Sequence, residues 1–180
     1  MSIPRILPLV FCLLSVISAQ GANDLFLNIS GVPGESRDSN HPNQIEVLAW
    51  SWGLSNPATA GTGGTPRSGI VQIQELFITK YLDKSSPVLM LGCSKGTIYS
   101  TVTLSVRKSG ATRDYLVVTL SDVLVTSIST GGSGGEDRLT ENLSLNFTKV
   151  KLDYYEQKPD GTYNSTPITY NWNILTNSES

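Results

Sequence analysis

Alternation of apolar and polar residues predicts strands along most of this chain, and the longest run lies toward its C-terminal end. Leu143, Leu145 and Phe147 alternate with polar residues, so three apolar side chains point to one face of a strand. From Val150 onward the apolar residues occupy even positions, and such a phase change predicts a β-bulge or a sharp bend. Bends of this kind let a long strand curl around a closed sheet.

The same pattern recurs in shorter runs separated by turn-forming residues. Residues 108–114, with Gly110, predict a hairpin turn between two neighbouring antiparallel strands. Phase slips are expected near residues 74–75 and 121–122. Further strands are predicted at residues 24–30, 44–55, 69–80, 101–107 and 115–120, with a last one through Ile168, Tyr170 and Trp172.

One segment, residues 83–92, has the pattern of a helix. Ser85 or Ser86 can cap its start, Pro87 suits its first turn, and Gly92 is expected to end it. A single short helix among seven or eight strands places the chain in the mainly-β class. The fold expected is therefore a curved antiparallel β-barrel with one short flanking α-helix.

The strand predicted at residues 44–55 has two unlike faces. Trp50 and Trp52 share one face and are expected to be largely buried, whereas Ser51 lies on the opposite, small-residue face. That second face suits an interface or a lumen. The residues that follow, 56–69, are rich in glycine, threonine and proline and predict a long flexible excursion.

The N-terminal segment differs from the rest of the chain. Arg5 is followed by an apolar run over residues 6–19 and then by small residues up to Ala22, which is the order of a secretory signal peptide. A membrane anchor is disfavoured because a spanning helix needs about 20 apolar residues. We therefore expect a signal peptide at residues 1–21, a single domain at residues 22–180 and a mature protein that is secreted, either periplasmic or extracellular.

Composition and candidate chemistry argue against an enzyme. The formal charge is −2, so no electrostatic feature favours nucleic acid. The single histidine, His41, is predicted to lie in a surface loop, and Cys93 is predicted to be a buried small hydrophobe, so the two are not expected to form a dyad. Neither metal-ligand spacing nor a phosphate-binding loop is present, so no catalytic, cofactor or metal residues are assigned.

A glycine-rich stretch precedes the longest strand pattern and ends in Glu136, Asp137 and Arg138. Its sequence, STGGSGGEDRLTEN at residues 129–142, resembles a hallmark motif of the haemolysin-coregulated protein (Hcp) family. Members of this family are the tube subunits of bacterial type VI secretion systems. Three more stretches resemble the same family in the same order: IEVLAWSWGL at residues 45–54, QELFITKYLDKSSPVLMLGC at 74–93 and TYNWNI at 169–174. Together they extend the resemblance over residues 23–177.

The resemblance implies a barrel subunit that forms hexameric rings, which stack into a tube and carry or accompany effector proteins. It also implies that residues 56–69 form the extended loop that helps rings stack. Glu136, Asp137 and Arg138 are then expected near a subunit boundary, and Ser51 on the lumen or cargo face. The signal peptide is not a feature of the family, so the alternative is an Hcp-like exported ring-former or binding module that acts without a contractile apparatus.

Overall fold

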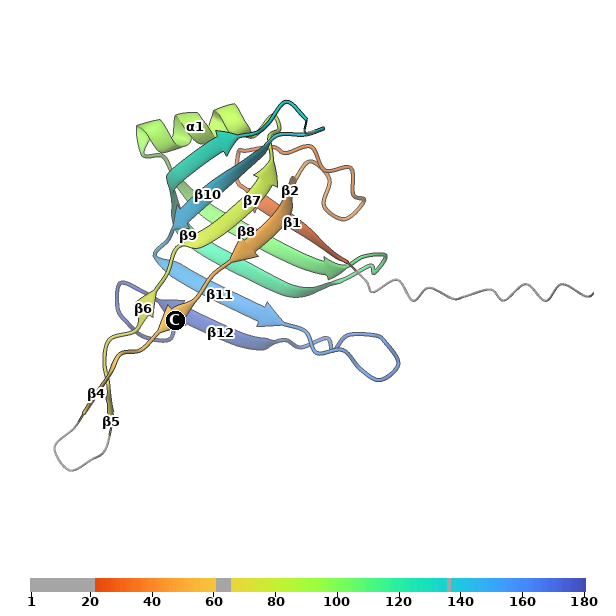
Figure 1. Cartoon of the computed structure of the whole chain (residues 1–180). Coiled ribbons are helices and arrows are strands. Elements are labelled where there is room, and N and C mark those ends of the chain that lie inside the picture. Colours follow the sequence, from red (N-terminus) through yellow and green to blue (C-terminus); the bar gives the residue numbers. More distant parts are fainter. Residues whose placement is uncertain (1–21, 61–65, 136) are drawn as a thin grey trace, which may run out of the picture.

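Six antiparallel strands close into a barrel in the computed structural model, which describes residues 22–60, 66–135 and 137–180 (Figure 1). The closure depends on the longest strand, which pairs with β8 along its first part and with β10 along its last part. This confirms the mainly-β barrel fold. In sheet order the barrel strands are β10 (Thr140–Asn146), β7 (Leu76–Tyr81), β2 (Ile45–Ser51), β1 (Asn23–Ile29), β8 (Ile98–Lys108) and β9 (Asp114–Gly131).

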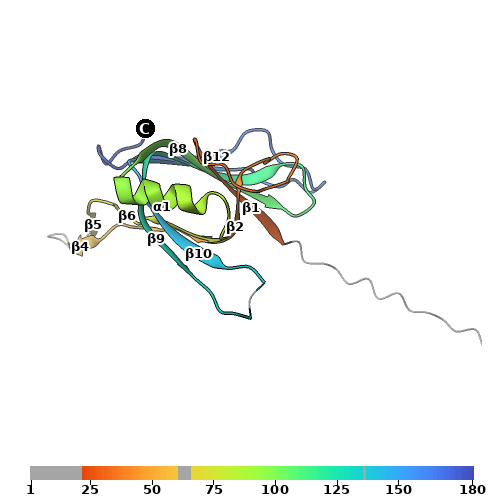
Figure 2. The same ribbon diagram turned by 90° about the horizontal axis from the view of Figure 1, so that it is seen from above.

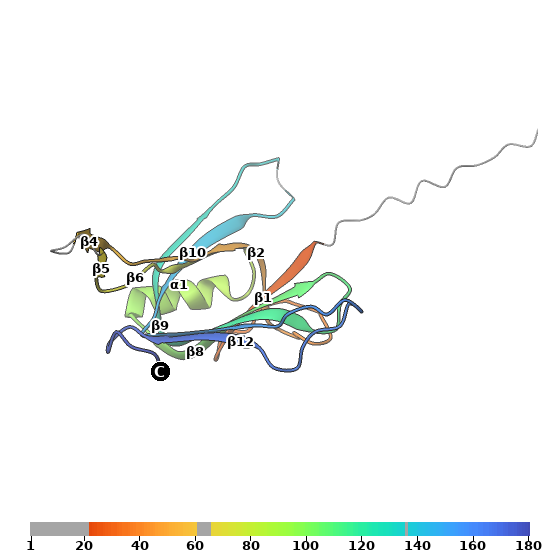
Figure 3. The same ribbon diagram turned by 90° about the horizontal axis from the view of Figure 1, so that it is seen from below.

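The remaining strands form two extensions of the barrel. One is the pair β11 (Lys149–Tyr154) and β12 (Ile168–Asn173), which continues the sheet from β9. The other is an arm, made of β3 (Leu54–Ser55) with β6 (Gln72–Ile73) and, further out, β4 (Ala58–Ala60) with β5 (Pro66–Ser68). Figure 3 shows the arm and the β9–β10 hairpin projecting from the barrel in different directions.

The arm corrects one expectation from the sequence. Residues 56–69 were expected to be a long flexible excursion, yet their described parts are strands paired in register, Ala58 with Ser68 and Ala60 with Pro66. Ladder hydrogen bonds satisfy the backbone there, which composition alone does not predict. The phase slip expected near residues 74–75 is confirmed, because the more buried residue of β6 is the odd Ile73, whereas those of β7 are the even Leu76 and Ile78.

The helix α1 (Ser86–Lys95) covers one end of the barrel (Figure 2). Ser85 occupies the N-cap position, but its hydroxyl donates to Asp83 and makes no capping bond to the helix, and Gly96 caps the C-terminal end with a left-handed φ of 65°. The prediction that Gly92 ends the helix is therefore wrong. Gly92 is needed for a different reason, since a Cβ there would lie 2.2 Å from the Tyr99 hydroxyl oxygen.

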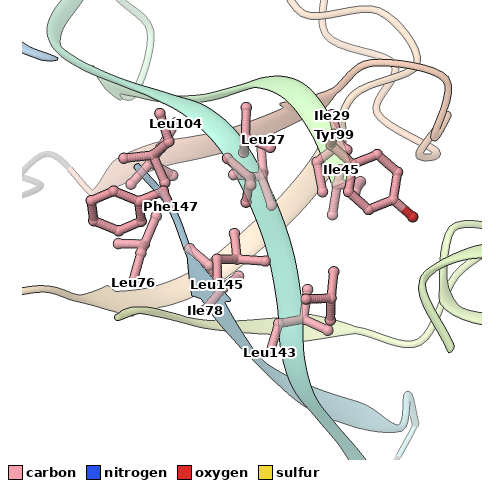
Figure 4. Close-up of a cluster of buried hydrophobic side chains, with 14 of the residues drawn as sticks. Leu27, Ile29, Ile45, Leu76, Ile78, Tyr99, Leu104, Leu143, Leu145 and Phe147 are labelled. Carbon is pink, nitrogen blue, oxygen red and sulfur yellow. The ribbon is translucent and has the colours of Figure 1, made fainter. Parts of the chain in front are cut away.

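The core fills the barrel interior with aliphatic side chains from every barrel strand (Figure 4). Leu89 of α1 closes it at the covered end and is fully buried. The most completely buried hydrophobic members are Leu27, Ile45, Leu76, Leu89, Val123, Leu145 and Val150, each at 0% exposure. Burial of this apolar surface is the main stabilising contribution to the fold.

A buried ion pair fastens α1 to the barrel wall. Lys80 of β7 and Glu141 of β10 are cross-strand partners, and their Nζ and Oε1 atoms lie 2.6 Å apart with both side chains at 0% exposure. The same ammonium lies 2.8 Å from Asp83 Oδ1, and the Ser86 hydroxyl donates to Glu141 Oε1 at 2.8 Å. Because a buried charge without partners costs several kcal/mol, this network fixes the start of the helix over the β7–β10 pair.

The sheet bends sharply at the same level in three strands, β9, β10 and β11. In β9 the buried residues are Val118 and Leu120 before the corner and Val123 and Val125 after it, so the phase slips at Asp122, whose φ is +52°. This confirms the slip expected at residues 121–122. On the neighbouring edge, β10 ends at Asn146 and β11 begins at Lys149, so the predicted phase change is a bend that separates two strands.

Thr148 holds this corner together. Its backbone N–H donates to Ser121 O at 3.0 Å, and its hydroxyl donates to Asp122 Oδ2 at 2.8 Å. The chain leaving β10 is thereby bonded to β9 at the residue where β9 itself bends. The strand β10 continues around the barrel, whereas β11 continues into the flat extension.

Replacing Asp122 tests the importance of this corner. Asp122→Val places a β-branched residue at φ +52° and removes the bond from Thr148, so unfolding free energy should fall by about 2 kcal/mol. Asp122→Asn tolerates this conformation and still accepts the bond, so it should stay close to the wild type. Urea unfolding followed by tryptophan fluorescence measures both, with Thr119→Val in the regular part of β9 as the control. Equal stability of the valine and asparagine variants would show that a β-branched side chain causes no strain at the corner.

Candidate functional site

The outer surface of four neighbouring strands carries two matched rows of mostly small polar side chains. Strand pairing aligns the first row as Ser51, Phe77, Ser144 and Ser127 across β2, β7, β10 and β9. It aligns the second row as Ala49, Thr79, Asn142 and Ser129. We call these eight residues the polar face. The Thr79 hydroxyl donates to Asn142 Oδ1 at 2.8 Å, which orders the second row.

A hollow of about 350 Å³ lies on the polar face. The eleven residues that line it include all eight members of the face, and none of the eleven is charged. Phe77 is the exception to the small side chains, with 46% of its surface exposed. The sequence pattern identified Ser51 on this face but missed Phe77, because the two become neighbours only through the β2–β7 pairing.

The structure places Ser51 and its flanking tryptophans on opposite faces, as the alternation predicts. Ser51 is exposed. Trp50 and Trp52 pack against the core but are half-buried, so the prediction of largely buried rings overstated their burial. Trp52 lies beyond the end of β2, where its indole N–H donates to Gln74 O at 3.1 Å and its ring lies 6.2 Å from that of Tyr170.

The glycine-rich hairpin tip was the other candidate site. Glu136 lies outside the described residues, while Asp137 and Arg138 are exposed. The Arg138 guanidinium lies 4.0 Å above the Tyr81 ring, a cation–π contact that holds it against the end of β7. Arg138 is thus presented at the tip of the β9–β10 hairpin, beside the end of β7.

Both sides of the four-stranded layer that carries the polar face end in unpaired strand segments. Pairing of β8 with β9 stops at Leu124, so within the described residues the following part of β9 pairs with β10 alone. At the opposite side, β1 pairs with β2 only at Ile45 and Glu46. The layer therefore presents backbone donors and acceptors at each side, which a strand from another chain can pair with.

The residues considered for catalysis lie in separate environments. His41 was expected in a surface loop, but it is buried, with its ring stacked on Phe26 at 4.3 Å between centroids. Its ring nitrogens lie 3.0 Å from Asp114 Oδ1 and 3.2 Å from Gln44 Oε1. The expectation failed because these tertiary contacts fold the proline-rich loop onto the barrel. Cys93 is half-buried on α1 and packs against the core.

The loop before β2 is fastened by Asp38. The two terminal guanidinium nitrogens of Arg107, Nη1 and Nη2, donate to its carboxylate, Nη1 at 3.1 Å from Oδ1, and the backbone N–H of His41 also donates to Oδ1 at 3.1 Å. The hydrogen bonds from Arg107 lower the pKa of Asp38 to about 2. Arg107 is itself buried and also pairs with Asp24, so this cluster is a structural clasp on β1 and β8.

No group of three or more histidine, cysteine, aspartate or glutamate side chains suited to hold a metal ion occurs within residues 22–60, 66–135 and 137–180. Over the same residues, no helix is long and apolar enough to cross a membrane.

Comparisons with known proteins agree with this geometry. The family model described as "Type VI secretion system effector, Hcp" matches residues 26–154. Protein hcp1 of Pseudomonas aeruginosa is 50% identical over 158 residues, which are 87% of this chain and 98% of that protein.

Solved structures show the same relationship. A structure of a type six secretion system protein aligns with a TM-score of 0.83 at 27% identity, covering 88% of this chain and 100% of that one. Hcp1 from Salmonella typhimurium aligns with a TM-score of 0.73 at 33% identity, covering 88% and 99%. A type VI secretion system effector from Yersinia pestis aligns with a TM-score of 0.69 at 32% identity, covering 84% and 100%.

The closed barrel, the helix α1 and the arm define a structural β-barrel subunit. The chain belongs to the Hcp family of type VI secretion system proteins. It is a tube protein of that secreted class, as the four sequence stretches indicated.

The Asp38 clasp generates a pH prediction. Because its folded-state pKa is depressed, the charged carboxylate stabilises the fold above the ordinary value of 3.8, and this contribution is lost as the pH falls toward about 2. Asp38→Asn should therefore cost about 1 kcal/mol at pH 7, a figure reduced for partial exposure of the pair. Thermal unfolding from pH 7 to pH 2 should show the two proteins converging at the acid end. The exposed Glu179→Gln serves as control, and a constant gap at all pH values would contradict the assignment.

Proposed function

We propose that this chain forms a closed ring of six subunits, and that the rings stack into the tube of a type VI secretion system. The observation that carries the proposal is the four-stranded layer, each side of which has a segment without a strand partner among the described residues. The two segments belong to different strands, so pairing β9 of one subunit with β2 of the next is a heterologous contact. Such contacts close into a ring when the rotation between subunits allows it.

The polar face is proposed to line the lumen of this ring. If strand pairing at the edges continues the layer from one subunit to the next, one face of the layer points to the inside of the ring. The other face points to the core of its own subunit. The core side is filled by residues such as Ile78 and Leu143, so the uncharged polar face with Ser51 is the one left to face the channel. We propose that effector proteins are carried there.

The β9–β10 hairpin is proposed to lie at the subunit boundary. It continues directly from the unpaired part of β9, so a neighbour that pairs with β9 comes close to Asp137 and Arg138. Glu136 is assigned to the same boundary by its place in the sequence. The arm formed by β3, β4, β5 and β6 projects from the barrel and is proposed to contact the next ring of the stack (Figure 1).

We further propose that the protein has no catalytic turnover and no cofactor. His41 is buried and contacts Asp114 and Gln44, so its role is structural. Cys93 packs against the core. Nucleic acid is not a proposed partner, since the polar face offers no cation to bind phosphate.

Sedimentation of the mature protein tests the ring and its boundary. The wild type at tens of micromolar should sediment as a hexamer. Arg138→Glu should weaken assembly several-fold while leaving the fold intact, because charge contacts at a partly exposed boundary contribute about 1 kcal/mol each. Added salt should produce part of the same weakening in the wild type.

Arg113→Glu is the matched control. Arg113 also lies over a tyrosine, 4.4 Å from the Tyr155 ring, but it is not part of the β9–β10 hairpin. A folded wild-type monomer would refute the ring and favour the exported binding module. Equal weakening by both variants would remove Arg138 from the boundary.

Export is a separate proposal: residues 1–21 are removed as a signal peptide, and the mature chain begins near Ala22. It rests on the order of basic, apolar and small residues in that segment. Intact mass of protein recovered outside the cytoplasm should correspond to the shortened chain. Secreted protein that retains Met1 would contradict cleavage and leave export to the contractile apparatus alone.

A further inference from the structure

Phe77 stands out on the polar face. Its direct neighbours in the first row are Ser51 on β2 and Ser144 on β10, and both are small hydroxyl residues. Nearly half of the Phe77 surface, 46%, is nevertheless exposed to solvent. Burying that surface against a partner is favourable in proportion to its apolar area. The position is therefore suited to an anchor contact.

The hollow beside Phe77 has the size and shape for such a contact. Its volume of about 350 Å³ exceeds that of a single side chain, and small residues line it on β2, β10 and β9. Aromatic side chains that fill or border a pocket commonly dominate the binding energy of an interface. A partner can thus insert one apolar side chain beside Phe77.

The chemistry of the lining defines what surrounds that side chain. No charged residue lines the hollow. A carboxylate or ammonium of the partner would lose hydration there without gaining a counter-charge. The serine hydroxyls and the amide of Asn142 can instead bond backbone groups and uncharged polar side chains. The Thr79 hydroxyl donates to Asn142 Oδ1, which orients the amide, and the Asn142 amide nitrogen can donate to the partner.

We propose that Phe77 is the anchor of the cargo site, and that the cargo it accepts is a protein surface with an exposed apolar side chain surrounded by uncharged polar groups. The inference rests on the proposed ring, whose lumen the polar face would line. Six copies of Phe77 would then encircle the channel, and repeated weak contacts around one passenger add to its retention.

Saturation-transfer difference NMR on the assembled mature protein tests the anchor with two defined peptides. One is uncharged and apolar, acetyl-Ser-Leu-Phe-Ser-amide, and the other is charged, acetyl-Ser-Glu-Lys-Ser-amide. The wild type should bind the apolar peptide and give little response with the charged one. Phe77→Ser should weaken binding of the apolar peptide about tenfold. Phe77→Leu keeps an apolar anchor and should restore most of it.

Leu91→Ser is the matched control, since Leu91 is 53% exposed on α1 and away from the polar face. It should leave peptide binding unchanged. Sedimentation of each variant is recorded in parallel, and Phe77→Ser should remain a hexamer.

The outcomes separate the anchor from the ring. An intact Phe77→Ser hexamer that binds the apolar peptide as well as the wild type would overturn the anchor and leave the ring standing. Dissociation of that variant would identify Phe77 as a subunit contact and would also overturn the anchor. Equal binding of the two peptides by the wild type would overturn the anchor as well. A monomeric wild type would refute the ring, while selective, Phe77-dependent binding by that monomer would still support the anchor.

Discussion

The double pairing of β9 is the constraint on which the rest of the structure depends. One strand of 18 residues borders both β8 and β10, and without this shared strand the six-stranded sheet would remain open. It serves both neighbours through two irregularities: at Asp122 φ is +52° and the buried side switches from even to odd residues, and at Thr126 the register with β10 shifts. Thr148 bonds the adjacent chain to Asp122. Barrel and extension therefore separate at a single fixed corner.

The corner also shapes the surface on which the proposed function depends. Beyond Leu124, β9 leaves β8 and continues beside β10, so among the described residues its outer edge is unpaired while its outward side chains align with those of β10, β7 and β2. The result is a flat polar layer with edges available for assembly. Edges of this kind usually promote association, and closure into a ring uses them in a defined way. The proposed assembly and cargo contacts thus lie on one layer.

Buried polar contacts hold the parts around this layer in place. The Lys80–Glu141 pair fixes α1 across the β7–β10 ladder, and the Asp38–Arg107 clasp fixes the loop that leads into β2. Both lie behind or beside the polar face rather than on it. The face can therefore remain uncharged, and its chemistry is set by hydroxyls, one amide and Phe77.

The sequence by itself determined the barrel strands, the hairpin at Gly110 and the family, because period-two alternation and turn residues are local signals and the four motifs are contiguous. It could not determine which strands meet. The pairing of Ser51 with Phe77 joins residues 26 positions apart, and the burial of His41 depends on contacts with Phe26 and Asp114. Gly92 was misassigned for the same reason, since the Tyr99 hydroxyl it accommodates comes from the next strand. Local pattern sets the direction of each side chain, but only tertiary packing decides what it faces.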